Sequence, residues 1–210
     1  MASSDIDAEV QALLTPDNAR FEALLQSLTS ADNDARGKAE AVFAGLRGRP
    51  DLCAHYLVST LRGCASVQHR SFCAVMIRKV LAKGDRPMWP ELSKQVQDLM
   101  KNELLNSVKE ERERRVVRKV CDAVSELAAL ALDGDGWPEI IPFIFQCVQS
   151  GQAHLMESGL LILSDFAQKD HHDSLKEYSG PLLQVLEACL KHQAGDVKLA
   201  AFGATCAVVQ

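Results

Sequence analysis

The stretch that most constrains the fold runs from Arg114 to Gln149, RRVVRKVCDAVSELAALALDGDGWPEIIPFIFQCVQ. In its first half, apolar residues recur at steps of three and four, a spacing that places them on one face of an α-helix. They are Val117, Val120, Cys121, Val124, Leu127, Ala128 and Ala131. Polar side chains take most of the other positions: Arg115, Arg118, Lys119, Asp122, Ser125 and Glu126. The pattern predicts an amphipathic helix with one buried face.

A short turn follows this helix. The apolar run ends at Asp133-Gly134-Asp135-Gly136, where glycines can adopt a positive φ and close the helix. Trp137-Pro138 comes next, and proline suits the first turn of a new helix because its missing N–H is not needed there. The helical apolar pattern then resumes at Ile140, Ile141, Ile144, Phe145 and Val148. So short a turn folds the second helix back against the first.

The same design recurs along the chain. Arg70 precedes Trp89-Pro90 by 19 residues, as Arg118 precedes Trp137-Pro138, and the two copies lie 48 residues apart. Weaker echoes of the second-helix start give the series Arg36, Arg70, Arg118, Glu157 and Lys198, at steps of 34, 48, 39 and 41 residues. Two-helix units repeating at roughly 40–47 residues are typical of HEAT and armadillo solenoids.

We therefore predict an all-α fold, an α-α superhelix of about five antiparallel helix pairs. A flexible acidic N-terminus (1–16) precedes repeats at 17–48, 49–84, 85–135, 136–170 and 171–210. The last helix, Val197 to Val209, has no polar capping face beyond it, although terminal repeats need one. We expect the array to continue beyond residue 210 and this helix to expose an apolar face.

Composition and charge narrow the function. The net charge of −5 weighs against nucleic acid as a main partner, because phosphate binding needs a basic surface. The seven cysteines contain no C-x-x-C pair and lie mostly in apolar helical stretches, which predicts reduced thiols and a reducing compartment, cytosol or nucleus. The N-terminus lacks the features of a signal peptide, and no apolar stretch is long enough to cross a membrane.

Candidate catalytic and metal-binding motifs are weak. Lys169-Asp170-His171-His172-Asp173 is better explained as a solvated loop than as a metal site, and Cys189 with His192 is only half of a metal site. The sequence contains no nucleophile elbow, Walker loop or dinucleotide fingerprint. We predict no enzyme activity, no cofactor and no metal.

Charged residues leave two interpretations open. The run Lys109 to Lys119, KEERERRVVRK, could grip an acidic partner, but a solvated bend between helices is favoured. Arg70 and Arg118 could contribute to binding, or they could bond a neighbouring repeat or loop.

Three stretches resemble the N-terminal HEAT repeats of importin-5-type karyopherins. Ala74 to Leu81, AVMIRKVL, resembles their "AVLLRRLL" segment. Lys119 to Ala128 resembles their "KVCD…ELA" helix, and Gly136 to Val148 resembles "GWPE…PFVFQCV", especially in plant forms. The similarity extends over about residues 20–210.

This resemblance implies a function. Importin-β-like receptors carry cargo with nuclear localisation signals through nuclear pores, contact nucleoporin FG repeats on convex grooves, and release cargo when Ran-GTP binds the concave, second helices of the first repeats. They shuttle between cytoplasm and nucleus. For this chain it implies Ran contacts by solvent-facing residues of the second helices: Arg78, Lys79, Lys119, Asp122, Glu126 and Asp165. The alternative is a cytosolic HEAT-repeat scaffold that does not bind Ran.

Overall fold

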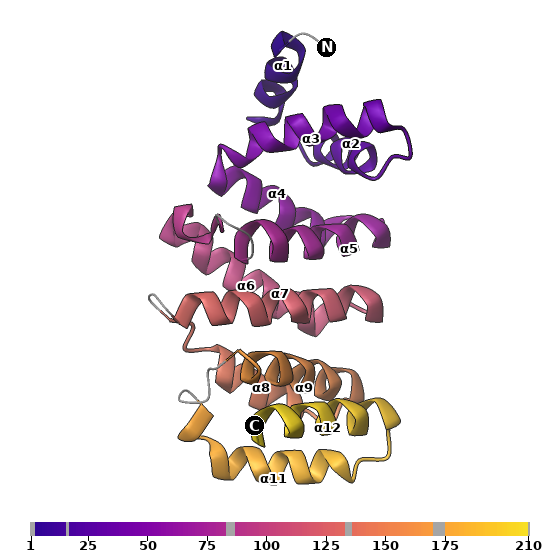
Figure 1. Ribbon diagram of the computed structural model, residues 1–210. Coiled ribbons are helices and arrows are strands. Elements are labelled where there is room, and N and C mark those ends of the chain that lie inside the picture. Colours follow the sequence, from indigo (N-terminus) through magenta and orange to yellow (C-terminus); the bar gives the residue numbers. More distant parts are fainter. Residues whose placement is uncertain (1–2, 16, 83–86, 133–135, 170–174, 210) are drawn as a thin grey trace. The chain divides into compact units, whose positions relative to one another are not determined.

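The computed structural model describes residues 3–15, 17–82, 87–132, 136–169 and 175–209. Every regular element in these ranges is a helix, which confirms the predicted all-α fold (Figure 1). The chain divides into two compact units, residues 1–103 and 104–210, and the boundary falls inside helix α6 (Lys94–Glu110).

In its described residues, the first unit contains five complete α-helices and two short helical turns. These are α1 (Ser3–Leu13), α2 (Asn18–Leu28), α3 (Asn33–Arg47), α4 (Pro50–Gly63), α5 (Val67–Met76), the π-helix η1 (Ile77–Ala82) and the 3₁₀-helix η2 (Trp89–Glu91). Helix α2 packs against α3, α4 and α5, and α4 packs against α5 and η1. The first part of α6 joins this unit through an ion pair of 2.8 Å between Arg62 and Glu103.

Side-chain caps explain where several of these helices begin. The carboxylate of Asp17 accepts from the first N–H groups of α2, and Asp32 does the same for α3. The hydroxyl of Ser66 accepts from the backbone N–H of His69 and opens α5. Pro50 occupies the first turn of α4, where its missing N–H costs nothing. These caps satisfy backbone donors that have no partner inside the helix.

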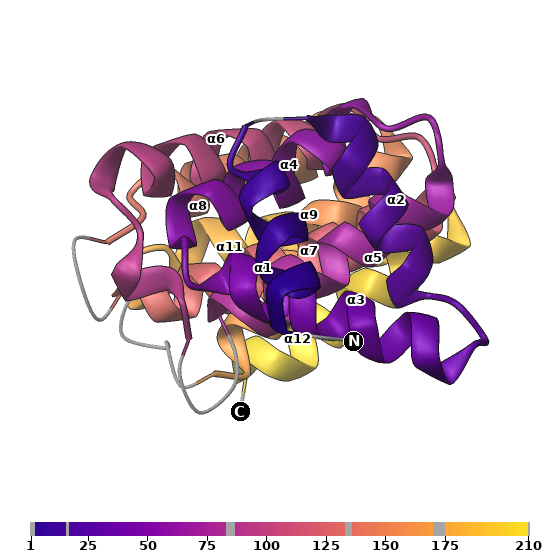
Figure 2. The ribbon, with the colours of Figure 1, turned by 90° about the horizontal axis from the view of Figure 1, so that it is seen from above.

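The N-terminus differs from the flexible acidic segment that was predicted. Residues Ser3–Leu13 form α1, which packs against α3 (Figures 1 and 2). The buried hydroxyl of Tyr56 donates to the carbonyl oxygen of Leu13 at 2.8 Å and accepts from the N–H of Asp17 at 3.0 Å. Tyr56 also stacks on Phe21, with ring centroids 4.8 Å apart. A tyrosine 43 positions away thus fixes the end of α1, and short-range patterns do not reveal such a contact.

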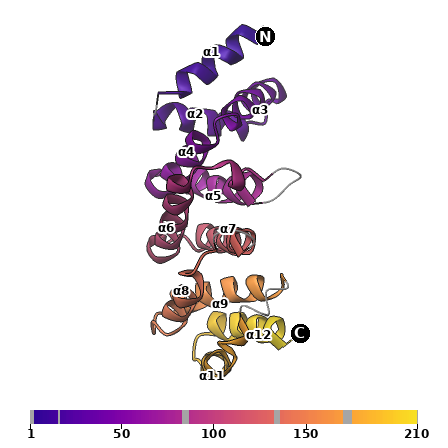
Figure 3. The same cartoon turned by 90° about the vertical axis from the view of Figure 1, so that its left-hand side faces the viewer.

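The second unit forms two layers of helices. The later part of α6 leads into α7 (Arg114–Leu132), α8 (Ile140–Val148), α9 (Ala153–Ala167), α11 (Ser179–Leu190) and α12 (Gly195–Val209). Helices α7, α9 and α12 form one layer, and α8 and α11 lie in the other (Figure 3). Helix α9 is central, because it packs against α7, α8 and α12. We call α7, α9 and α12 the second-helix layer.

Helices α8 and α9 approach each other closely at Gly159. A Cβ atom there would lie 2.8 Å from the Cβ of Cys147 and 3.1 Å from the carbonyl oxygen of Ile144. The absence of a side chain therefore permits this packing. At the turn before α8, Gly136 has a φ of +77°, as expected for a glycine that closes a helix, while residues 133–135 lie outside the described ranges.

The prediction of the buried face of α7 was partly wrong. Ser125 was placed on the polar face of α7 but is fully buried, and its hydroxyl donates to the carbonyl oxygen of Cys121 at 2.9 Å. That bond satisfies the buried hydroxyl within its own helix. Helix α5 continues as the π-helix η1 after Met76. Helix α6 begins at Lys94, after the separate turn η2 that contains Pro90.

Each predicted repeat from 17–48 to 171–210 contains two α-helices in its described part, while the repeat boundaries stay a prediction. Six of the seven cysteines are buried, and none is in a disulfide. On α12, Leu199 and Phe202 are 69% and 62% exposed, whereas Val197 is buried. Over the described residues, the structure holds no helix with both the length and the apolarity needed to cross a bilayer.

Candidate functional site

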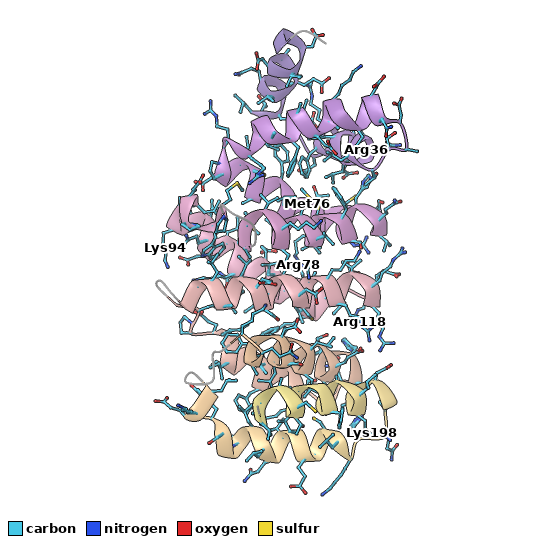
Figure 4. All side chains as sticks on the ribbon, in the orientation of Figure 1. Arg36, Met76, Arg78, Lys94, Arg118 and Lys198 are labelled. Carbon is cyan, nitrogen blue, oxygen red and sulfur yellow. The ribbon has the colours of Figure 1, made fainter. Side chains whose placement is uncertain are left out.

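The predicted Ran-contact residues Arg78 and Lys79 lie in the first unit, on the π-helix η1 (Figure 4). Arg78 is half-buried and Lys79 is exposed. Their neighbours Ile77, Val80 and Leu81 are buried and fix η1 on α4. A π-turn contains more residues than an α-helical turn, and such turns are frequent at functional sites. Lys79 is thus the more accessible of the two charges.

The other predicted residues lie in the second unit. Lys119, Asp122 and Glu126 are on α7 and Asp165 is on α9, and all four are half-buried. Glu126 forms an ion pair of 3.4 Å with Lys169, just beyond the end of α9. This pair joins α7 to the C-terminal end of α9.

Asp122 and Asp165 both affect one buried thiol of the second-helix layer. Burial is the main reason why the pKa of Cys121 is raised, and the negative charges of Asp122 and Asp165 raise it further. A carboxylate of α7 and a carboxylate of α9 thus act on the same side chain.

A buried carboxylate with two arginine partners on this layer was not among the predicted site residues. Glu157 on α9 is only 8% exposed, and its Oε1 atom accepts hydrogen bonds from Arg114 at 2.8 Å and Arg118 at 2.9 Å. Both arginines come from α7 and have half-exposed side chains. A buried carboxylate needs such partners, because an unpaired buried charge is costly.

Arg114 extends this network to a third helix. Its guanidinium lies 2.6 Å from Asp196 in the first turn of α12, and the hydrogen bonds to Glu157 and Asp196 raise the pKa of Arg114. Asp196 is well placed there, since a helix N-terminus favours negative charge. The network of Arg114, Arg118, Glu157 and Asp196, which we call the arginine staple, therefore joins α7, α9 and α12.

The arginine staple borders a groove of about 380 Å³. Arg112 and His154 line the same groove, with the Arg112 Nη1 atom 3.5 Å from the His154 Nε2 atom. Cationic and anionic side chains both line it, and apolar Val117 and Leu161 form part of its wall. The arrangement suits a polar protein interface more than a substrate pocket, because no activated nucleophile lies among the lining residues.

The repeat pattern explains why the arginine staple could be only partly foreseen. Arg36 donates to the carbonyl oxygen of Ser30, and Arg70 donates to that of Cys64, so each holds the loop before its own helix. Arg118 instead bonds the next repeat through Glu157. The interpretation in which Arg70 bonds a loop and Arg118 bonds a neighbouring repeat is thus confirmed. The sequence did contain one sign of this contact. Glu157 is the anion in a series whose other members, Arg36, Arg70, Arg118 and Lys198, are cations.

The structure gives a local role to His192 and places the thiols of Cys53 and Cys147 in the core. His171, His172 and the adjoining aspartates lie outside the described residues. Cys189 is buried, while the Nδ1 atom of His192 accepts from the N–H of Ala194 at 3.1 Å, so this histidine serves its own turn. Burial raises the pKa of Cys53 to about 12 and of Cys147 to about 11, which leaves neither as a reactive thiolate at neutral pH.

Comparisons with known proteins support the proposed resemblance. Residues 112–210 match the family described as IPO5-like, TPR repeats. Over 142 residues the chain is 24% identical to a probable importin-5 homolog of Dictyostelium discoideum, an alignment that covers 67% of this chain and 13% of that protein.

Solved structures share the fold over nearly the whole chain. Kap121p aligns with 91% of this chain at a TM-score of 0.76 and 21% identity. Yeast importin-beta (Kap95p) aligns with 92% at a TM-score of 0.79 and 18% identity. The chain covers 18% and 24% of these two proteins. The fold is that of an importin HEAT-repeat solenoid, and the resemblance to importin-5-like members of the importin-β family is confirmed.

Proposed function

We propose that this importin-β-family solenoid is part of a nuclear transport receptor and that its second helices bind Ran-GTP. The observation that carries the proposal is the match to Kap121p bound to RanGTP, which covers 96% of this chain at a TM-score of 0.72 and 20% identity. A second related structure, of Kap95p, describes its effect on the switch loops of RanGDP. The shared fold supports a shared kind of partner.

The chemistry of the second helices agrees with this proposal. Lys79 is exposed on η1, and Lys119, Asp122, Glu126 and Asp165 are half-buried charges on α7 and α9. Half-buried charges of both signs suit recognition of a polar protein surface, because they steer the encounter and penalise wrong partners. Such a function needs neither a cofactor nor a catalytic group.

The wider role follows from the same family. The receptor would bind cargo proteins with nuclear localisation signals and nucleoporin FG repeats, and it would shuttle between cytoplasm and nucleus. Binding of Ran-GTP and of cargo would be coupled, and the coupling free energy is the same in both directions.

Ran binding can be tested with charge-reversal variants of the 210-residue chain. Isothermal titration would measure affinity for Ran loaded with GDP or with a non-hydrolysable GTP analogue. We expect selective binding of the GTP form. Arg78→Glu with Lys79→Glu should weaken it by about tenfold or more, since charges at the centre of an interface contribute more than rim charges. Lys94→Glu, on the first helix α6, is the matched control and should bind normally.

The second unit has its own pair of variants. Asp122→Asn with Glu126→Gln removes two charges from α7 without changing side-chain size, and Glu187→Gln on the first helix α11 is the control. Failure of the wild-type chain to bind either form of Ran, with its helicity intact, would favour the scaffold alternative. Equal affinities of Arg78→Glu/Lys79→Glu and wild type would remove these two residues from the site.

A further inference from the structure

Three side chains of metal-ligating type meet in the first unit, away from the charges discussed so far. They are Glu22 of α2, Cys64 at the end of α4 and His69 in the first turn of α5. One ligand atom of each lies within 4.8 Å of the others. The Cys64 Sγ atom is 3.8 Å from the Nδ1 atom of His69. We call Glu22, Cys64 and His69 the α2–α5 cluster.

The turn that carries two of these residues is held rigidly. The backbone N–H of Cys64 donates to the carbonyl oxygen of Thr60 at 3.0 Å and ends α4. Ser66 caps α5 through the N–H of His69. Arg70 donates to the carbonyl oxygens of Cys64 and Ala65 at 2.9 and 3.0 Å. The backbone positions of Cys64 and His69 are therefore held before any ligand binds.

The third residue is positioned by core packing. Glu22 follows Phe21, which is fully buried and stacks on Tyr56 of α4. This stacking anchors α2 beside α4 and fixes the side from which the Glu22 carboxylate approaches. Cys64 is 6% exposed, whereas Glu22 and His69 are half-buried, so an ion could reach the cluster from solvent.

We propose that the α2–α5 cluster binds a Zn²⁺ ion. Thiolate, imidazole and carboxylate are the protein ligands that zinc takes in tetrahedral sites, at about 2.0–2.3 Å from the metal. Tetrahedral geometry at those bond lengths separates ligand atoms by about 3.3–3.6 Å, close to the observed distance between Cys64 Sγ and His69 Nδ1. Small side-chain movements bring the Glu22 carboxylate into the same range.

The charges balance. On binding, the Cys64 thiol loses its proton to solvent, so one thiolate and one carboxylate neutralise the two positive charges of the ion. Neutral His69 supplies the third ligand and a water molecule the fourth. The bound ion would tie α2 to the turn between α4 and α5 and stabilise the first unit. This inference is independent of Ran binding.

The test uses Co²⁺ as a spectroscopic probe in the 210-residue chain, kept reduced with a non-chelating phosphine. Cobalt bound to a thiolate shows near-ultraviolet charge-transfer absorption and, in tetrahedral sites, intense visible bands. We expect one equivalent of Co²⁺ to produce both and Zn²⁺ to displace it. Cys64→Ser should abolish the charge-transfer band. His69→Asn and Glu22→Gln should weaken binding by about tenfold or more, the range seen when metal sites lose supporting groups.

Cys206→Ser is the matched control, because Cys206 is the exposed cysteine among those described. It should leave the spectrum unchanged, and Zn²⁺ should raise the thermal midpoint of wild type and control alike. A missing band in wild type, or a band that persists in Cys64→Ser, would overturn the proposal. If Cys64→Ser lost helicity, unchanged Co²⁺ affinity in both His69→Asn and Glu22→Gln would overturn it instead.

Discussion

Removing both arginines that bond Glu157 should destabilise the second unit by more than the sum of the two single substitutions. In Arg114→Ala, Glu157 still accepts from Arg118 at 2.9 Å, and in Arg118→Ala it still accepts from Arg114 at 2.8 Å. Only the double variant strands a carboxylate that is 8% exposed. The two arginines are therefore partly redundant, and redundancy appears as non-additive free energies.

The exposure of these side chains sets how far each substitution lowers the free energy of unfolding. Both arginine side chains are about half exposed, so solvent replaces much of each lost bond, and we expect each single substitution to cause only a small part of the loss seen in the double variant. Stranding a buried charge costs about 3–5 kcal/mol. Because the Glu157 side chain retains 10% exposure, the lower end applies, about 3 kcal/mol for the double variant. Most of that loss is then coupling between the two substitutions.

The two tryptophans provide the assay. Trp89 is buried in the first unit and Trp137 in the second. With Trp89→Phe as the common background, fluorescence during urea unfolding would report the second unit through Trp137. Arg115→Ala is the matched control, because Arg115 is exposed on the same helix and should change the free energy of unfolding by less than about 0.5 kcal/mol.

A rescue variant completes the experiment. Adding Glu157→Gln to the double variant removes the stranded charge and should recover about 1–2 kcal/mol of unfolding free energy, since a neutral amide is cheaper to bury. Additive effects of the two arginine substitutions, or no recovery with Glu157→Gln, would refute the redundancy argument. The charge of Glu157 would then not be what the arginines satisfy.

Three further predictions test other contacts. Gly159→Ala should lower the free energy of unfolding, measured by chemical denaturation, by about 1–3 kcal/mol, because the added Cβ meets α8. Gly37→Ala is the control: no atom lies within 4 Å of the added Cβ, and the substitution should stabilise α3 by about 0.5–1 kcal/mol. Tyr56→Phe removes the hydroxyl that holds the end of α1, so hydrogen exchange should accelerate in residues 3–13, with a stability loss of about 1–3 kcal/mol. A thiol reagent at pH 8 should modify exposed Cys206 rapidly. It should modify Cys53 only on unfolding, since burial raises the pKa of Cys53 to about 12. A fast phase of thiol modification that survives in Cys206→Ser would contradict this.

Short-range patterns predicted the elements well. The apolar spacing of α7 and the proline and glycine breaks after it define the helix pair correctly, because the hydrophobic face of a helix is encoded within a few turns. The apolar spacing did not predict the burial of Ser125, because a hydroxyl can hydrogen-bond within its own helix and be buried at little cost. The predicted face was also turned slightly, because Val116 and Ala123 are fully buried while Val117 is half-buried.

Polar contacts between repeats were harder to predict. Glu157 bonds Arg118 from 39 positions away, and Glu22 meets Cys64 from 42 positions away. Which charges meet depends on the relative rotation of packed helices, which a single sequence does not specify. The repeat series identified Arg118 and Glu157 as equivalent positions but could not indicate that they touch.

The π-helix η1 has a consequence for insertions and deletions. Its wide turn holds more residues than an α-helix of the same rise, so the segment Ile77–Ala82 contains spare chain. Deleting Lys79 should let this segment rewind as α-helix, with the change absorbed locally. The fold would survive, but the charge carried by η1 would fall and Arg78 would point in a new direction. Single-residue length variation at this turn is therefore expected to alter the surface proposed to bind Ran while preserving the solenoid.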